Sequence, residues 1–122
     1  MCMIKSIISG KAGEGARHLI ENAIRNIIKE EPDSLCFIFD HTSQFVPLKI
    51  RLNGFSVGMC LNFEKDIESN ISKHNGNNLY LLRAWEIEYH LQNDLLKEVE
   101  DFLMQLQNRL DSRIYLFYCD VY

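Results

Sequence analysis

Glu86, Glu88 and His90 have the residue types from which acid–base and metal chemistry is built, and they alternate along the sequence. We predict a strand over residues 79–90, in which side chains two positions apart share a face. Two carboxylates and an imidazole on one face could bind a divalent metal or exchange a proton with a substrate. A metal site needs a second cluster of ligands, and nothing in the sequence brings Asp40-His41 near. We therefore expect solvated or partner-contacting charges, the default for carboxylates.

The segment Gly10–Arg17 (GKAGEGAR) has the G-x-x-x-x-G spacing that resembles a P-loop. A P-loop continues with Lys and Ser or Thr, which bind phosphates and magnesium, whereas this chain has Ala16 and Arg17. Residues 114–120 (IYLFYCD) faintly resemble the strand that carries the acidic magnesium ligand, but Val121 follows. We interpret the glycines as a flexible connection between a strand and a helix. A degenerate nucleotide-binding site at Gly10–Arg17 remains the alternative.

Nucleophilic catalysis has no support in the sequence, because it contains no G-x-S-x-G and no recognisable Cys–His signature. The cysteines form no C-x-x-C pair, which argues against a zinc ribbon or a redox motif. Free thiols in a core fit a reducing cytosol. We therefore predict a non-enzymatic, cytoplasmic protein with no catalytic residue, cofactor or metal. The four cysteines are Cys2, Cys36, Cys60 and Cys119.

Length and composition indicate a single domain over residues 1–122, with 47% apolar and 25% charged residues. No apolar run approaches the roughly 20 residues of a membrane helix, so no membrane association is predicted. The net charge of −4 divides unevenly, as +1 over residues 1–63 and −5 over residues 64–122. A nucleic-acid-binding surface would be basic and clustered, and none is predicted. An acidic half suits a basic protein partner instead.

The predicted fold is organised around Asn53-Gly54, the dipeptide that most strongly favours a two-residue hairpin turn. Alternating apolar residues on both sides place Ile50 opposite Val57, and Phe37 would face Leu48 across a preceding loop. The pattern therefore predicts a three-stranded antiparallel meander over residues 34–64.

Helices are predicted both before and after this meander, from the spacing of apolar residues. Apolar residues recur at spacings of three and four from Ala16 to Ile28, and Pro32 ends that helix. A second amphipathic helix follows Asn93, its predicted N-cap, and reaches Leu110. Short strands are predicted at residues 3–9 and 113–122. The expected fold is an α+β domain, with a mainly antiparallel sheet and both helices packed on one face.

Tyrosines and the single tryptophan are concentrated in the acidic part of the chain. Aromatic side chains beside carboxylates are typical of binding surfaces, so we predict that this region binds a protein partner. The predicted contact residues are Glu86, Glu88, Tyr89, His90, Asp94, Glu98 and Asp101.

The overall profile resembles bacterial immunity proteins of contact-dependent growth inhibition and other polymorphic toxin systems. The resemblance lies in small size, uneven acidic charge and the lack of catalytic signatures. It implies a toxin inhibitor that neutralises a cognate toxin, such as a nuclease, by direct protein–protein interaction. It assigns no role to any single residue, because that family has no common motif. A looser resemblance is to secretion-system effector chaperones, which are also acidic and share a helix–meander–helix order.

Overall fold

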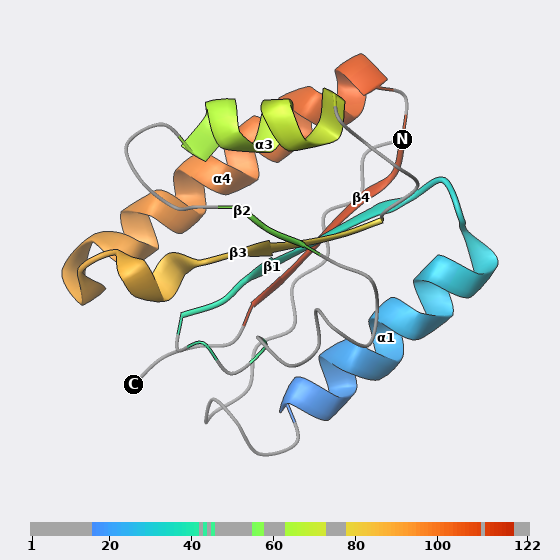
Figure 1. Cartoon of the computed structure of the whole chain (residues 1–122), viewed down its shortest axis with the longest axis horizontal. Coiled ribbons are helices and arrows are strands. Elements are labelled where there is room, and N and C mark those ends of the chain that lie inside the picture. The colour runs from blue at the N-terminus through green and yellow to red at the C-terminus, as the bar shows by residue number, and fades with distance from the viewer. Residues whose placement is uncertain are drawn as a thin grey trace.

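The protein, described here from a computed structural model, combines a sheet with helices on both of its faces (Figure 1). The structure describes residues 16–41, 43, 45, 55–57, 63–72, 78–110 and 112–118. In chain order the elements are α1 (Ala16–Glu30), β1 (Leu35–Phe39), β2 (Phe55–Val57), α3 (Phe63–Ser72), β3 (Leu79–Leu82), the 3₁₀ helix η1 (Ala84–Glu86), α4 (Tyr89–Leu110) and β4 (Ile114–Tyr118).

Within the described residues the sheet has four strands in the order β2-β3-β1-β4, and its three pairings are all parallel. In register, Phe37 lies beside Tyr80 on one side and beside Leu116 on the other. The rings of Phe37 and Tyr80 stack with centroids 4.9 Å apart. The prediction of a mainly antiparallel sheet is therefore wrong, although the chain does mix helices with strands.

The meander predicted over residues 34–64 fails for a geometric reason. A strand has two edges, and those of β1 are occupied by β3 and β4, so Phe37 cannot also pair with Leu48. β2 lies beside β3 rather than β1, with Val57 next to Leu82. The turn at Asn53-Gly54 falls outside the described residues and stays a prediction.

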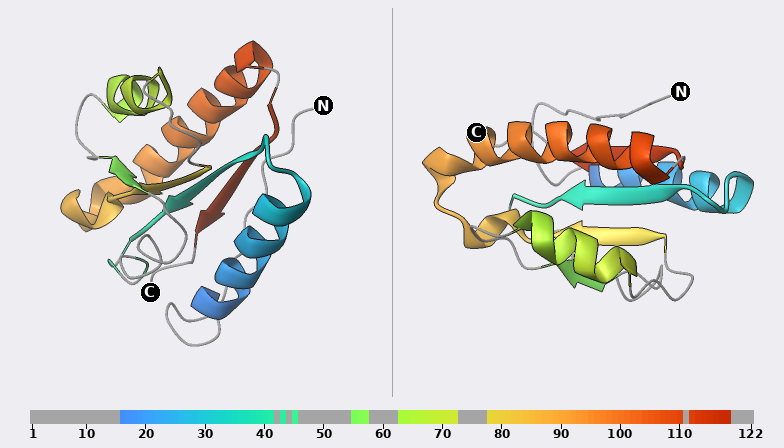
Figure 2. Two further views of the ribbon diagram at one scale, coloured as in Figure 1. Left: turned by 45° about the vertical axis from the view of Figure 1, so that its right-hand side comes forward. Right: turned by 90° about the horizontal axis from the view of Figure 1, so that it is seen from above.

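Helices cover both faces of this sheet, which corrects the expectation that they share one face (Figure 2). Alternate residues of β1 point to opposite sides, so Phe37 and Phe39 join one core and Cys36 and Ile38 the other. The first core includes residues of α3 and α4, namely Ile67, Leu96, Val99, Leu103 and Leu106. The second includes Ile20 and Ile24 of α1. Strands buried on both faces are typical of parallel sheets.

The amphipathic helix predicted from Ala16 is confirmed as α1. Its last turn closes with the Glu31 N–H donating to the Ile27 carbonyl at 2.7 Å. Pro32, which follows, has no N–H with which to extend this pattern. The second predicted helix is also confirmed, as α4, but it begins at Tyr89. Asn93 therefore lies inside the helix and is not its N-cap.

The strand predicted over residues 79–90 ends at Leu82. After Leu82 the backbone forms the 3₁₀ turn of η1, in which the Ile87 N–H donates to the Ala84 carbonyl at 3.0 Å. Trp85 packs against the core beneath α1, whereas Ile87 packs against the core beneath α4. Side chains two positions apart on one strand would share a face, so this segment cannot be a strand.

Candidate functional site

The carboxyl ends of β1 and β3 lie side by side, and polar residues gather at this edge of the sheet. The backbone N–H of Asp40 donates to the Leu82 carbonyl, and the Trp85 N–H donates to the Asp40 carbonyl, both at 3.0 Å. Figure 1 shows η1 and the start of α4 at this edge. In parallel sheets the carboxyl edge is the usual location of binding sites.

Three buried polar side chains occupy this edge: Asp40, His41 and Gln92. One carboxylate oxygen of Asp40 accepts the Phe45 N–H at 3.1 Å, which holds the turn after β1. Within that turn Ser43 has a φ of 61°, a left-handed conformation that is uncommon for a residue other than glycine.

The side chain of Gln92 connects this turn to α4. Its Nε2 donates to the carbonyls of Ala84 and Ile87, both at 3.0 Å, and its Oε1 lies 2.7 Å from His41 Nδ1. The two carbonyls can only accept, so the amide orientation is fixed and Oε1 must face the imidazole. His41 Nδ1 must therefore carry a proton and act as the donor.

The seven predicted contact residues lie on the surface, from η1 through the first half of α4. Each is exposed in the structure: Glu86, Glu88, Tyr89, His90, Asp94, Glu98 and Asp101. Residues 86–101, which we call the acidic corner, contain six acidic residues and one lysine. Its net charge of −5 equals that of the whole segment 64–122. The uneven charge seen in the sequence is therefore concentrated in η1 and the first half of α4.

Large apolar side chains are also exposed at the start of α4. Tyr89 retains 59% of its accessible surface and Leu91 retains 46%. They follow Glu86 and Glu88 in the chain and precede Asp94, so apolar groups are flanked by carboxylates. Two positions apart on a helix, Tyr89 and Leu91 point to different sides of it. Exposed aromatic residues among polar ones are typical of protein-binding surfaces.

The alternation of Glu86, Glu88 and His90 does not place them on one strand face, because η1 and α4 replace the strand. Glu88 Oε2 lies 3.6 Å from His90 Nε2, and Glu86 Oε1 lies 3.6 Å from Arg83 Nη1. Among the described residues, no three His, Cys, Asp or Glu side chains are arranged to hold a metal ion.

Sequence reasoning did not assign a role to Arg83 or Gln92, and it considered Asp40-His41 only as a possible metal cluster. Arg83 Nε is buried and has no hydrogen-bond partner among the residues that the structure describes. A signal for Asp40 was available, since this residue follows five consecutive apolar residues, as polar residues at the end of a buried parallel strand do. Gln92 had no such signal.

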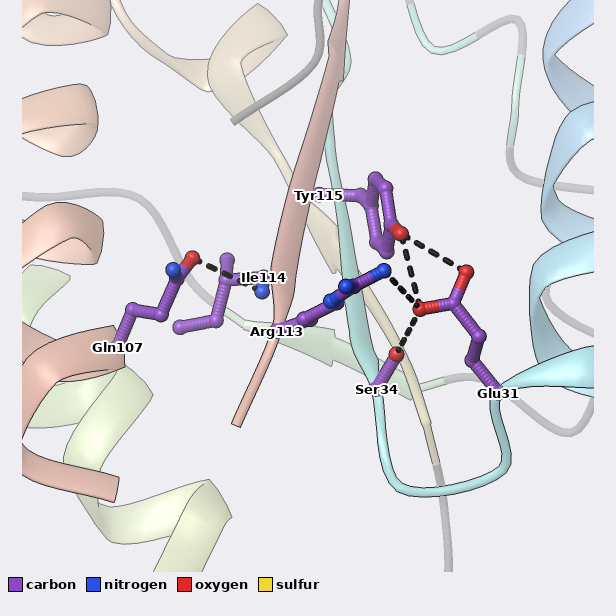
Figure 3. Close-up of polar contacts among 6 residues, drawn as sticks. All are labelled: Glu31, Ser34, Gln107, Arg113, Ile114 and Tyr115. Atoms are coloured by element: carbon purple, nitrogen blue, oxygen red, sulfur yellow. Dashed lines mark hydrogen bonds and ion pairs between the residues drawn. The ribbon is translucent and has the colours of Figure 1, made fainter. Parts of the chain in front are cut away.

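A second polar cluster lies at the amino ends of β1 and β4 (Figure 3). The Glu31 carboxylate accepts hydrogen bonds from Ser34 Oγ at 3.4 Å and Tyr115 Oη at 3.0 and 2.9 Å, and it pairs with Arg113 Nη1 at 3.1 Å. Burial, and then the hydrogen bond to Glu31, raises the pKa of Tyr115. Each of the three donor side chains has the Glu31 carboxylate as its acceptor. We therefore interpret the cluster as a structural link between α1, β1 and β4.

Residues 10–15 of the P-loop-like segment fall outside the described residues. Ala16 and Arg17 form the start of α1.

The chain matches no protein-family model, and no curated protein or solved structure shows significant similarity to it. Across the ranges that the structure describes, every helix is too short or too polar to cross a membrane.

Proposed function

We propose that this protein acts by binding a basic protein partner through the acidic corner. The observation that carries the proposal is the exposure of Tyr89 and Leu91 within a segment of net charge −5. Exposed carboxylates contribute little to folding, so their concentration at one corner needs another explanation. Binding supplies one, because a charged surface speeds encounter with an oppositely charged partner.

The two kinds of side chain have separate roles in this proposal. Tyr89 supplies the contact that loses water on binding, and a large aromatic residue is a frequent energetic centre of interfaces. Glu86, Glu88 and Asp94 orient the approaching partner at distances up to the Debye length, about 8 Å at physiological ionic strength. The partner should therefore present an apolar pocket surrounded by Lys and Arg.

Within this class we propose an immunity protein that neutralises a toxin, as the sequence profile suggests. A nuclease toxin fits the required chemistry, because an enzyme that acts on phosphodiesters needs a basic substrate-binding surface. An acidic corner could cover that surface and compete with nucleic acid. Inhibition would then weaken as salt concentration rises.

Site-specific photocrosslinking tests the location of the interface. A photoreactive phenylalanine analogue replaces Tyr89 in one variant and Asn22, exposed on α1 across the sheet, in the control. The proposal predicts an adduct with one basic protein from position 89 and none from position 22. Equal adducts from both positions, or an adduct from position 22 alone, would place the interface elsewhere.

A second candidate function is phosphate binding at Gly10–Arg17. The pairings of the described strands are all parallel, which suits the strand–glycine loop–helix order of such a site. α1 begins at Ala16, directly after the glycines, and the start of a helix favours anions. Millimolar ATP with magnesium should raise the melting temperature if this site binds, and Arg17→Ala should abolish the rise. The protein-binding proposal predicts no rise.

A further inference from the structure

Buried glutamines hold α4 at both of its ends. Gln92 lies in the early part of the helix, at the carboxyl edge of the sheet, and Gln107 lies near its end, at the amino edge. Gln107 Oε1 accepts the Ile114 N–H at 3.0 Å, which connects α4 to the start of β4 (Figure 3). The two residues share type, burial and helix, but their partners differ in what they position.

The backbone partners of Gln92 lie at the start of the acidic corner. Its amide binds the carbonyls of Ala84 and Ile87, so one side chain fixes η1 and the link to α4 against the helix itself. Glu86, Glu88 and Tyr89 all lie between Ala84 and Gln92 in the chain. The Gln92 amide therefore helps to set their positions, beside the backbone hydrogen bonds of Trp85 to Asp40 and of Ile87 to Ala84.

His41 joins the same unit to the sheet. The imidazole comes from the residue after Asp40 at the end of β1, and its Nδ1–H donates to Gln92 Oε1 at 2.7 Å. An edge contact with Phe39, with ring centroids 4.9 Å apart, orients the ring. The chain of contacts runs from β1 through His41 and Gln92 to the backbone of η1.

We propose that His41 and Gln92 are positioning residues that hold the acidic corner in one conformation before a partner arrives. The inference rests on the proposed function for its biological purpose. A surface that is already ordered loses less conformational entropy on association, so it binds more tightly with the same contacts. The side chains of His41 and Gln92 connect β1 to η1 through hydrogen bonds. Changing either side chain should therefore loosen the acidic corner and leave the rest of α4 in place.

Hydrogen exchange measured by NMR, residue by residue, tests the connection without a partner. Gln92→Met keeps the length of the side chain and removes its polar atoms, and Gln107→Met makes the same change at the other end of α4. We expect Gln92→Met to speed exchange at the Trp85, Ile87 and Leu91 amides by tenfold or more. The amides of residues 103–106 should change less than twofold and serve as the internal reference. Gln107→Met should leave the three corner amides within twofold of the parent.

Substitutions of His41 separate the hydrogen bond from ring packing. His41→Phe keeps an aromatic ring against Phe39 but has no N–H to donate. His41→Asn loses the ring but places an amide N–H close to the position of Nδ1. We expect faster exchange at the corner in His41→Phe and rescue to within threefold of the parent in His41→Asn. ¹⁵N shifts of His41 in the parent should show the proton on Nδ1.

Equal acceleration throughout α4 in Gln92→Met would mean loss of global stability and would overturn the proposal, as would an unchanged corner in both Gln92→Met and His41→Phe. Parent-like exchange in His41→Phe together with fast exchange in His41→Asn would show that the ring, and not the hydrogen bond, positions the corner. These measurements need no partner. A missing adduct from position 89 would therefore remove the proposed function and leave the exchange result as it stands.

Discussion

Both carboxylate oxygens of Glu31 accept from the hydroxyl of Tyr115, at 3.0 and 2.9 Å, although 84 positions separate the two residues in the chain. The contact joins the end of α1 to β4 and therefore closes one edge of the fold. Tyr115 is buried, whereas the Glu31 side chain is one-third exposed. Water screens part of the interaction, which places its contribution at the low end of that for a charged hydrogen bond.

Removing the Tyr115 hydroxyl should weaken this link. We expect Tyr115→Phe to lower the free energy of unfolding by about 1–2 kcal/mol. Glu31→Leu leaves no acceptor for the hydroxyl and also removes the ion pair with Arg113, so it should cost at least as much. The two changes together should cost less than their sum, because each removes the same contact. Urea unfolding of the two single variants and the double variant measures the coupling. Strict additivity would show that the contact contributes nothing to stability.

Neighbouring residues on α4 should respond differently to truncation. Leu103 is fully buried in the core between α4 and the sheet, whereas Met104 is 48% exposed. We expect Leu103→Ala to cost about 2–5 kcal/mol, because it removes buried surface and leaves a cavity. Met104→Ala should stay within about 0.5 kcal/mol of the parent. Thermal or urea unfolding compares them, and similar losses would contradict the orientation of α4.

Alkaline pH should destabilise the protein. Burial, and then the negative charge of Glu31, raises the pKa of Cys36 from 9.0 to about 12, and burial raises that of Tyr80 from 10.0 to about 12. The folded state keeps these protons when the unfolded state loses them. The resulting stability is therefore complete below pH 9 and is lost as pH rises toward 12.

Each of these two groups should lower the free energy of unfolding by up to about 1.4 kcal/mol per pH unit within that window. Urea unfolding at pH 8, 9, 10 and 11 measures the slope. Cys36→Ala should show a shallower slope between pH 9 and 10 than the parent, because tyrosine ionises at higher pH. An identical slope would mean that the Cys36 thiol ionises as readily in the folded protein as in the unfolded chain.

Charge reversal at the acidic corner tests its role in association. We expect replacement of Glu86 and Glu88 together by Lys to leave the melting temperature nearly unchanged. Binding to the protein crosslinked from position 89 should fall tenfold or more, because like charges then face each other. The loss should shrink at 1 M salt, where the Debye length is about 3 Å.

The matched control for this change is the replacement of Glu30 and Asp33 by Lys. Both residues are exposed and lie outside the acidic corner, and the change in net charge is the same. The control should retain most of the affinity of the parent. Equal loss in both variants would indicate that net charge matters and its location does not.

Much of the local structure could be predicted from the sequence. α1 and α4 follow from apolar residues that recur every three or four positions, a pattern that depends only on helix geometry. The strands at Leu35–Phe39 and Ile114–Tyr118 lie within predicted strands. The exposure of the acidic contact residues in segment 86–101 was also predicted, because carboxylates are seldom fully buried.

The direction of strand pairing was decided only by the tertiary structure. The sequence alone determined that residues 35–39 form a strand, but not which segments lie beside it. A hairpin between neighbouring segments uses local contacts, whereas β1 instead pairs with β3 and β4, about 40 and 80 positions away along the chain. The five consecutive apolar residues of β1 fit a strand covered on both faces, which only the packing of helices on both sides of the sheet makes possible. The hydrogen bond between His41 and Gln92 depends on that same packing, because it forms only after α4 lies across the end of β1.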